Sequence, residues 1–295
     1  MTQITFISAT KLNHLENTRA FSVSLDPNTA EILLSSRLGN TPLSFAELSA
    51  LGDGLGGAHY LRADPVHLEA DLSQVYLRGN TGLDLSASEL DFLVEELNQH
   101  LQKDQLKLIA VNAKRWYLQA TQKIVVDTHA WMSCVNQAIT NYLPRDPDRH
   151  WERLFTELQM ILHASKINQQ RRQAGKPTLD ALWFFGSAPL EGLKQSAEMV
   201  AELWTDSPWA KGLALYHKIP VMDLKALNPL KLQDKAKILI HSENNEMDGI
   251  LQDLLLALSE HRVASIEVYP LNGKRYQIKK PKRWFKGLRQ CWKKN

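Results

Sequence analysis

The chain has 295 residues, of which 44% are hydrophobic and 23% are charged, and its formal net charge is +3. This composition excludes an intrinsically disordered protein, and no apolar run reaches the roughly 18 residues that a membrane-spanning helix needs. The two cysteines, Cys134 and Cys291, lie far apart, which argues against a disulfide scaffold and a cysteine zinc site. The first residues also lack the basic stretch and apolar region of a secretory signal. We therefore expect a cytoplasmic protein.

The positive charge is concentrated at the C-terminus. Residues 274–295 contain ten Lys or Arg and no Asp or Glu. The remaining 25 basic and 32 acidic residues give the rest of the chain about −7. A mildly acidic body therefore carries a strongly basic tail.

The first half of the chain alternates predicted strands and helices. The clearest helix begins at Ser86, which has capping-box spacing to Glu89 and precedes a stripe of leucines at helical spacing. The other elements expected here are a strand at 4–8, a short helix at 42–51 in a glycine- and serine-rich loop, an extended segment at 59–68, and strands at 106–111 and 115–120.

The second half continues the alternation. Apolar residues at helical spacing predict a helix from Asp148 to a stop signal at Gly175 and Pro177, whereas prolines break the stretch 186–220 and leave it unassigned. The other expected elements are strands at 182–185 and 237–242, a helix at 247–261, a hairpin of strands at 263–270 and 274–280, and a basic helix at 283–292.

This order of elements predicts an α/β fold with a mixed sheet and packed helices. We expect a single domain over 1–295. In a variant of this prediction, 1–59 forms a separate N-terminal segment and 274–295 a basic C-terminal hairpin and helix. That last helix is expected to dock on its own domain through Trp284 and Leu288.

Two motifs suggest ligand sites but have simpler interpretations. Residues 52–57, GDGLGG, match the dinucleotide pattern G-x-G-x-x-G, yet a helical pattern precedes them and an extended segment follows, so a plain glycine loop is predicted. His59, Asp64 and His67 form the densest group of metal-ligand residue types, but dispersed polar residues more often make structural contacts. The sequence predicts no metal site, no cofactor and no catalytic residue.

Arg62 and Asp64 are charged residues in an otherwise apolar strand. Burying a charge is costly unless it is paired, so one interpretation is an internal ion pair. The other is a guanidinium offered to an anionic ligand, because its planar fork matches carboxylate and phosphate. The sequence leaves both open.

The end of the helix predicted from Asp148 is basic. Lys166, Arg171, Arg172 and Lys176 cluster there around Asn168. Basic residues at a helix C-terminus commonly complement the helix dipole, and an anion site is the alternative.

Three segments carry a family resemblance: LRADPVHLEAD, ELQMILHASKINQQRRQAGKPTLDALWFFG and VYPLNGKRYQIKKPKRWFKGL. In this order they resemble the RpfE-type regulatory protein family of proteobacteria, whose members are often labelled phosphoglycerate mutase-like. The middle segment also resembles the substrate-binding insertion of archaeal-type cofactor-independent phosphoglycerate mutases. Their pattern HPxNxxRxxxG followed by a strand ending WxWG is matched by Asn168, Arg171, Gly175, Trp183 and Gly186.

The sequence departs from the mutase pattern in three ways, one of which is that the strand ends FFGSAP where the family has a glycine-rich WxWGGG. Ser165 and Lys166 stand where the pattern has His-Pro, with His163 two positions earlier. The resemblance also implies two divalent metals held by many Asp and His residues and a Ser or Thr nucleophile, and no such set is recognisable. The expected scaffold is therefore phosphoglycerate mutase-like without a two-metal phosphatase core.

The leading hypothesis is a cytoplasmic regulatory protein that binds a small phosphorylated or carboxylated metabolite without catalysis, with a protein as a further partner. Its expected ligand-binding residues are Arg62, Asp64, His67, His163, Asn168 and Arg171. One alternative is a cofactor-independent phosphoglycerate mutase or related metal-dependent phosphotransfer enzyme. Another is an adaptor that binds nucleic acid or anionic membrane through its basic tail, a contact that we do not expect.

Overall fold

A computed structural model describes residues 2–8, 21–24, 41–188, 200–228, 237–242, 247–260, 262–269 and 274–279. The chain forms two compact units, which we call unit 1 (residues 1–40 and 192–295) and unit 2 (residues 41–191). The limits of these units do not coincide with the boundaries considered at 59 and 274. That 1–295 behaves as one domain stays a prediction, because compactness alone does not decide whether the units unfold together.

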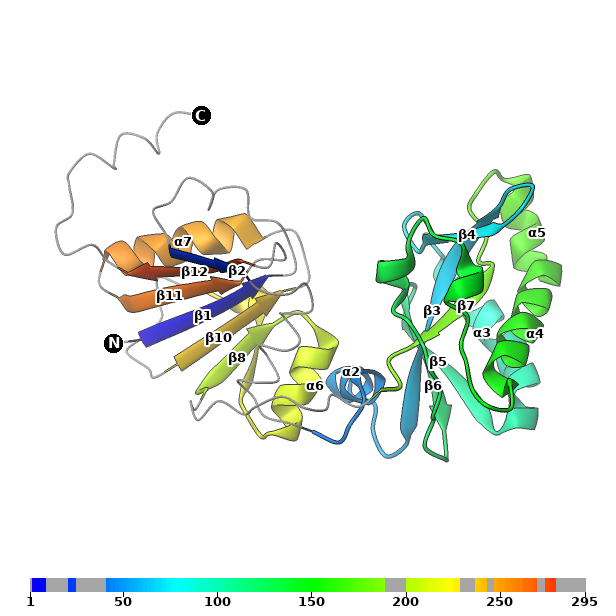
Figure 1. Cartoon of the computed structure of the whole chain (residues 1–295), viewed down its shortest axis with the longest axis horizontal. Helices are drawn as coiled ribbons and strands as arrows, with labels where there is room; N and C mark the ends of the chain where they lie inside the picture. The colour runs from blue at the N-terminus through cyan, green and yellow to red at the C-terminus, as the bar shows by residue number, and fades with distance from the viewer. Residues whose placement is uncertain are drawn as a thin grey trace. The chain divides into compact units, whose positions relative to one another are not determined.

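Unit 1 contains a mixed seven-stranded sheet (Figure 1). The central strands pair in parallel, whereas the strands at one edge form an antiparallel hairpin and its neighbour. In spatial order the strands are β2 (Phe21–Ser24), β12 (Lys274–Lys279), β11 (Val263–Tyr269), β1 (Thr2–Ser8), β10 (Lys237–Ser242), β8 (Glu202–Thr205) and β9 (Val221–Asp223). The mixed sheet and the hairpin at the C-terminal end of the described chain are as predicted.

Helices cover the sheet of unit 1. They are α6 (Pro208–Tyr216), α7 (Met247–Ser259) and the short η5 (Leu224–Ala226). Leu251 and Leu254 of α7 are buried against Ile240 of β10 and Ile266 of β11, which gives this unit its core. The predicted basic helix at 283–292 lies outside the described residues.

Unit 2 is a second α/β layer structure, with a five-stranded antiparallel sheet. Its strands are β3 (His59–Ala70), β4 (Val75–Gly79), β5 (Leu106–Asn112), β6 (Arg115–Ala120) and β7 (Ala181–Phe185). β3 pairs with β6 through its first residues, with β7 through its middle and with β4 through its last residues. β3 is therefore the strand on which this unit is organised.

The helices of unit 2 are α2 (Phe45–Gly52), α3 (Ala87–Leu101), α4 (His150–Ala164) and α5 (Lys166–Gln173), with short 3-10 turns η2 (Gln102–Asp104), η3 (Trp131–Cys134) and η4 (Ile139–Asn141). Figure 1 shows α3, α4 and α5 together on one face of the sheet. Leu93 and Leu97 of α3 and Phe155 and Leu158 of α4 are buried there with Trp183 of β7. The capping box predicted at Ser86 is present. The α/β class is confirmed in both units.

One predicted helix is in fact two. The sequence pattern from Asp148 to Gly175 predicts one continuous helix, but Ser165 has ψ 136° and separates α4 from α5. The side-chain amide of Asn168 donates to the carbonyl of Leu162, the acceptor that a continuing helix would use for residue 166. This local exchange of hydrogen bonds turns the chain.

Candidate functional site

Asp64 is a buried carboxylate at the centre of β3. Its side chain is 2% exposed, and both oxygens accept hydrogen bonds. Arg62 Nε and Nη2 lie 3.0 and 2.9 Å from Oδ1, and Nη2 lies 2.6 Å from Oδ2. The backbone N–H of Trp116 donates to Oδ1 and the indole N–H of Trp131 donates to Oδ2, each at 3.2 Å. The internal ion pair predicted as one of two alternatives is therefore present.

Two opposing effects act on the pKa of Asp64. Burial is the larger effect and raises the pKa of Asp64 above its ordinary value, although the guanidinium of Arg62 and the two tryptophan N–H donors favour the ionised form. All the groups that face this carboxyl are donors, so the geometry is that of a carboxylate that accepts on both oxygens.

The guanidinium of Arg62 is held by aromatic rings and by a hydroxyl. Its central carbon lies 5.3 Å from the ring centroid of Tyr117 and 5.1 Å from that of Phe185. At these distances ring faces attract a cation. Nη1 donates to Ser49 Oγ at 3.1 Å. The side chain is 11% exposed, so the orientation of the fork is fixed by its surroundings.

The hydrogen bonds continue from Arg62 toward the surface. Ser49 Oγ lies 2.7 Å from the hydroxyl of Tyr117, which donates to Asp53 Oδ2 at 2.7 Å. Arg115 closes this network with two bonds to Asp53, at 2.6 and 2.8 Å. Burial raises the pKa of Tyr117 above its ordinary value, so the phenol stays protonated and can donate. We call this set the β3 polar network.

His67 lies near the other end of β3 and is oriented by Asp180. Its Nδ1 is 2.7 Å from Asp180 Oδ2 and 3.1 Å from the carbonyl oxygen of Thr178. Because both neighbours accept hydrogen bonds, the proton belongs on Nδ1 and Nε2 is left to the surroundings. Asp180 is itself held by the backbone N–H of Leu68 at 2.9 Å and the hydroxyl of Thr178 at 2.7 Å.

The imidazole of His67 is partly exposed, and its hydrogen bond to Asp180 alters its pKa. The side chain of His67 is 28% exposed. The hydrogen bond to Asp180 raises the pKa of His67, against a smaller opposing effect of burial. No described residue forms a hydrogen bond with Nε2. A partly exposed histidine with a fixed tautomer can donate from Nε2 to an anion when it is protonated, or accept a proton there when it is neutral.

Asn168 and Arg171 are buried and bonded within the fold. Asn168 donates to the carbonyls of Leu162 and Leu179 at 2.7 and 2.6 Å and accepts from the N–H of Leu179 at 3.0 Å. Arg171 is 2% exposed and bridges Pro177 O at 2.7 Å and Glu89 Oε1 at 2.9 Å. Both side chains therefore make structural contacts, and their predicted ligand contacts stay a prediction.

The remaining predicted residues are dispersed. His163 is exposed at the end of α4, and its backbone carbonyl accepts from Arg172. His59 pairs with Glu47 at 2.7 Å, so the sequence group of His59, Asp64 and His67 is divided among three different partners. In the described ranges no three His, Cys, Asp or Glu side chains are placed to hold a metal ion. The predicted residues thus meet only at Arg62 and Asp64.

Sequence reasoning did not find Asp180, Ser49, Tyr117 or Arg115. Asp180 and His67 are 113 positions apart, and no local pattern joins them. Asp53 belongs to the glycine motif. As predicted, this motif forms a loop between the end of α2 and the start of β3.

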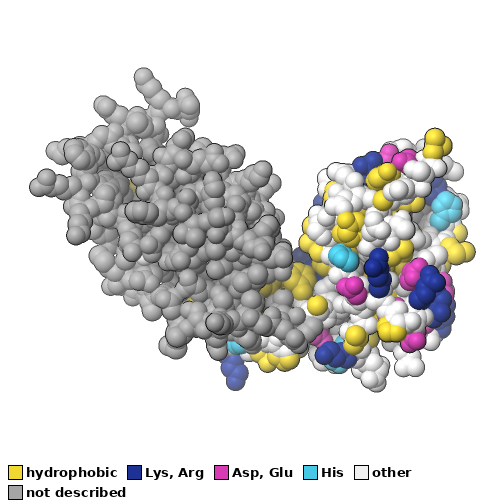
Figure 2. All heavy atoms as spheres, in the orientation of Figure 1, with side chains coloured by type: hydrophobic (Ala, Val, Ile, Leu, Met, Phe, Trp, Pro, Cys, Tyr) yellow, Lys and Arg dark blue, Asp and Glu magenta, His cyan; other side chains and the backbone are white. Residues whose placement is uncertain are grey.

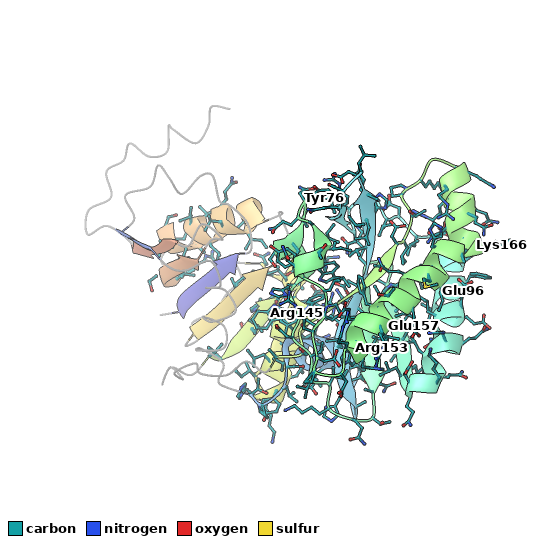
Figure 3. The ribbon with its side chains drawn as sticks, turned by 45° about the vertical axis from the view of Figure 1, so that its right-hand side comes forward. Tyr76, Glu96, Arg145, Arg153, Glu157 and Lys166 are labelled. Carbon is teal, nitrogen blue, oxygen red and sulfur yellow. The ribbon has the colours of Figure 1, made fainter. Side chains whose placement is uncertain are left out.

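Surface charges of unit 2 are mixed in sign. Figure 2 shows basic and acidic side chains next to each other over the face turned to the viewer. Ion pairs at the surface of unit 2 include Arg78 with Glu69 and Lys103 with Glu157. Figure 3 shows Glu157 projecting from α4 and Lys166 from the start of α5. Within the described chain no helix is both long and apolar enough to cross a membrane.

No protein-family model matches the chain, and no curated protein matches it. Several solved structures are similar to it, including the following two. One is the PH0037 protein from Pyrococcus horikoshii, with 13% identity and a TM-score of 0.51, covering 94% of this chain and 86% of that one. The other is the cofactor-independent phosphoglycerate mutase from Thermoplasma acidophilum DSM 1728, with 14% identity and a TM-score of 0.46, covering 97% and 91%.

At these identities the likeness concerns the fold alone. It extends over nearly the whole chain, so both units take part in it. The narrower resemblance to RpfE-type regulatory proteins stays a prediction from the sequence segments.

The glycine of the WxWG pattern has a structural reason. Gly186 ends β7 with φ 83°, a left-handed conformation that side chains other than hydrogen disfavour. A Cβ there would lie 3.1 Å from Phe45 Cδ1 and 3.2 Å from the backbone nitrogen of Ala46. The carbonyl of Gly186 accepts from that same nitrogen at 2.9 Å. Close approach of α2 to the end of β7 therefore selects glycine.

Proposed function

We propose that the chain is a regulatory protein of the RpfE type that binds a small phosphorylated or carboxylated metabolite and does not transform it. The observation that carries the proposal is the His67–Asp180 pair. A fixed imidazole that is partly exposed, has a raised pKa and forms no hydrogen bond from Nε2 to a described residue is suited to donate a charge-assisted hydrogen bond to an oxyanion.

The other candidate residues have a smaller role in ligand contact, because their side chains are already bonded within the fold. Arg62 is engaged by Asp64 and Ser49, and Arg171 is buried against Glu89. We therefore assign the first contact to His67 and regard the β3 polar network as the support that fixes the strand on which it stands.

The experiment is a titration of the full-length protein with 3-phosphoglycerate and with inorganic phosphate by isothermal calorimetry. Loss of a charge-assisted hydrogen bond costs about 1.5–3 kcal/mol, so His67→Ala should weaken binding roughly 10- to 100-fold. His129→Ala, which removes an exposed histidine elsewhere in unit 2, should leave the affinity unchanged.

The pH dependence has a defined sign. Because the imidazolium is the binding form, affinity should be greatest below the folded-state pKa of His67 and should fall as the pH rises through it. Equal affinity of wild type and His67→Ala at every pH would refute the assignment.

The enzyme alternative is tested in the same preparation. We expect no interconversion of 2- and 3-phosphoglycerate in a coupled assay with Mn²⁺ present. Turnover that His67→Ala abolishes would overturn the non-catalytic part of the proposal and make the His67–Asp180 pair an acid–base couple.

A further inference from the structure

A depression of about 450 Å³ lies at the edge of the unit 2 sheet, at the beginning of β3. The antiparallel pairing of β3 with β6 and of β5 with β6 brings His59, Ala120 and Leu106 level with one another. The start of β5, the end of β6 and the last residues of the glycine loop therefore meet there. The lining residues are Gly57, Ala58, Gln105, Leu106, Lys107, Gln119, Ala120 and Thr121.

The charge of this depression is positive. Lys107 is the one ionisable residue in its lining, and no acidic side chain faces it from the lining. Lys107 is exposed, and in the described part of the chain its ammonium forms no hydrogen bond or ion pair. Lys103, four residues earlier, is instead neutralised by Glu157 at 2.7 Å. A cation in a concave, acid-free site attracts anions, since nearby low-dielectric walls focus its field.

Hydrogen-bonding groups surround this cation. Gly57 lines the depression with φ 76°, and no heavy atom lies within 4 Å of the position that a Cβ would take there. Gln119 donates one amide N–H to the hydroxyl of Tyr60 at 3.3 Å, and the second N–H of the same NH₂ group is a further donor. Gln105 and Thr121 add an amide and a hydroxyl. The volume is that of a small-ligand site.

We propose that this depression is a second binding site, for the oxyanion of a small phosphorylated or carboxylated molecule, with Lys107 as the charged contact. It is distinct from the site at His67. The two positions are separated by eight residues along β3, which is about 26 Å at roughly 3.3 Å per residue. In this proposal the glycine loop lines a site for a small oxyanion, and not the dinucleotide site that its G-x-G-x-x-G pattern suggests.

The test is a titration of the ¹⁵N-labelled full-length protein with inorganic phosphate and, in parallel, with acetate, followed by amide chemical shifts. We expect the amides of Gly57 and Lys107 to shift in wild type and in His67→Ala. In Lys107→Ala the affinity for the anion, obtained from the shift of the Gly57 amide, should fall about tenfold, as for the loss of one charged hydrogen bond. Lys114→Ala is the matched control, because Lys114 is exposed in the turn at the opposite end of the same β5–β6 hairpin.

Each outcome decides between the sites. Shifts from phosphate alone identify a phosphate ester as the ligand class, and shifts from both anions identify a general carboxylate or phosphate site. Shifts at Gly57 that survive in Lys107→Ala, or no shift there with either anion, overturn this proposal. If the anion binds at Lys107 but not at His67, the proposed function is overturned and the second site is supported.

Discussion

Replacing Asp64 by Asn should destabilise unit 2 strongly, although the side chains have the same shape. One oxygen of Asp64 accepts from Arg62 and the Trp116 N–H, and the other accepts from Arg62 and the Trp131 indole. Whichever way the new amide turns, its NH₂ group faces donors. The substitution also leaves the guanidinium, 11% exposed, without its counter-charge.

The magnitude follows from this burial. Breaking a buried ion pair by removing one partner costs about 3–5 kcal/mol, and the slight exposure of Arg62 places the expected loss near the lower figure, about 3 kcal/mol. The total free energy of unfolding of a protein is about 5–15 kcal/mol, so the effect should be large. The double variant Arg62→Met/Asp64→Leu removes both charges. It should lose only about 1–2 kcal/mol, for the tryptophan N–H groups left without an acceptor.

The assay is native-state hydrogen exchange of the Trp116 amide in the full-length protein, with urea unfolding as a second measure. The amide of Trp116 reports locally, because its hydrogen bond ends on Asp64. Asp91→Asn, an exposed change on α3, is the control and should stay within about 0.5 kcal/mol. A loss below about 1 kcal/mol for Asp64→Asn, or a double variant less stable than the single one, would refute the reasoning.

Three further predictions concern other parts of unit 2. Arg171→Ala should cost about 3 kcal/mol because it removes a buried guanidinium that pairs with Glu89 and donates to the carbonyl of Pro177, whereas Arg172→Ala, exposed one position later, should change the urea midpoint little. Gly186→Ala should cost about 3 kcal/mol, and Gly54→Ala about 1 kcal/mol. Both glycines have positive φ, but only at Gly186 would a Cβ also meet neighbouring atoms, so equal thermal shifts of the two variants would contradict this prediction. The raised pKa of His67 contributes stability that is present below its unfolded pKa and is lost as the pH rises through the folded value, and His67→Ala should flatten that part of a stability-against-pH curve.

Elements that depend on nearby residues were predictable from the sequence. The capping box at Ser86 and the leucine stripe after it are local, and α3 begins where they place it. α6 could also have been found, because Pro208 occupies its first turn, a position that proline favours. Strands β2 and β4 were missed, as were β8 in the unassigned stretch and β9 directly after it.

Features that depend on distant residues were not predictable. The break between α4 and α5 requires Asn168 to reach both Leu162 and Leu179. Likewise, the charge pattern of β3 suggested an ion pair, but the partners that orient it come from α2, β6 and η3. Their positions follow from the tertiary fold, on which a single sequence carries no direct information. The site could therefore be predicted as a pair and not as a network.

Unit 2 is one uninterrupted stretch of chain, whereas the sheet of unit 1 is completed from both sides of it. On the ribosome β1 is synthesised long before its neighbours, since Ile4 pairs with Ile238 and Ile266. Unit 2 can complete its own contacts during that interval, because domains generally fold as they emerge. The hydrogen bond between Ala46 and Gly186 also brings the entry and exit of unit 2 together. A segment with adjacent ends can be excised or grafted by joining two points in a gene, without rerouting the strands of its host.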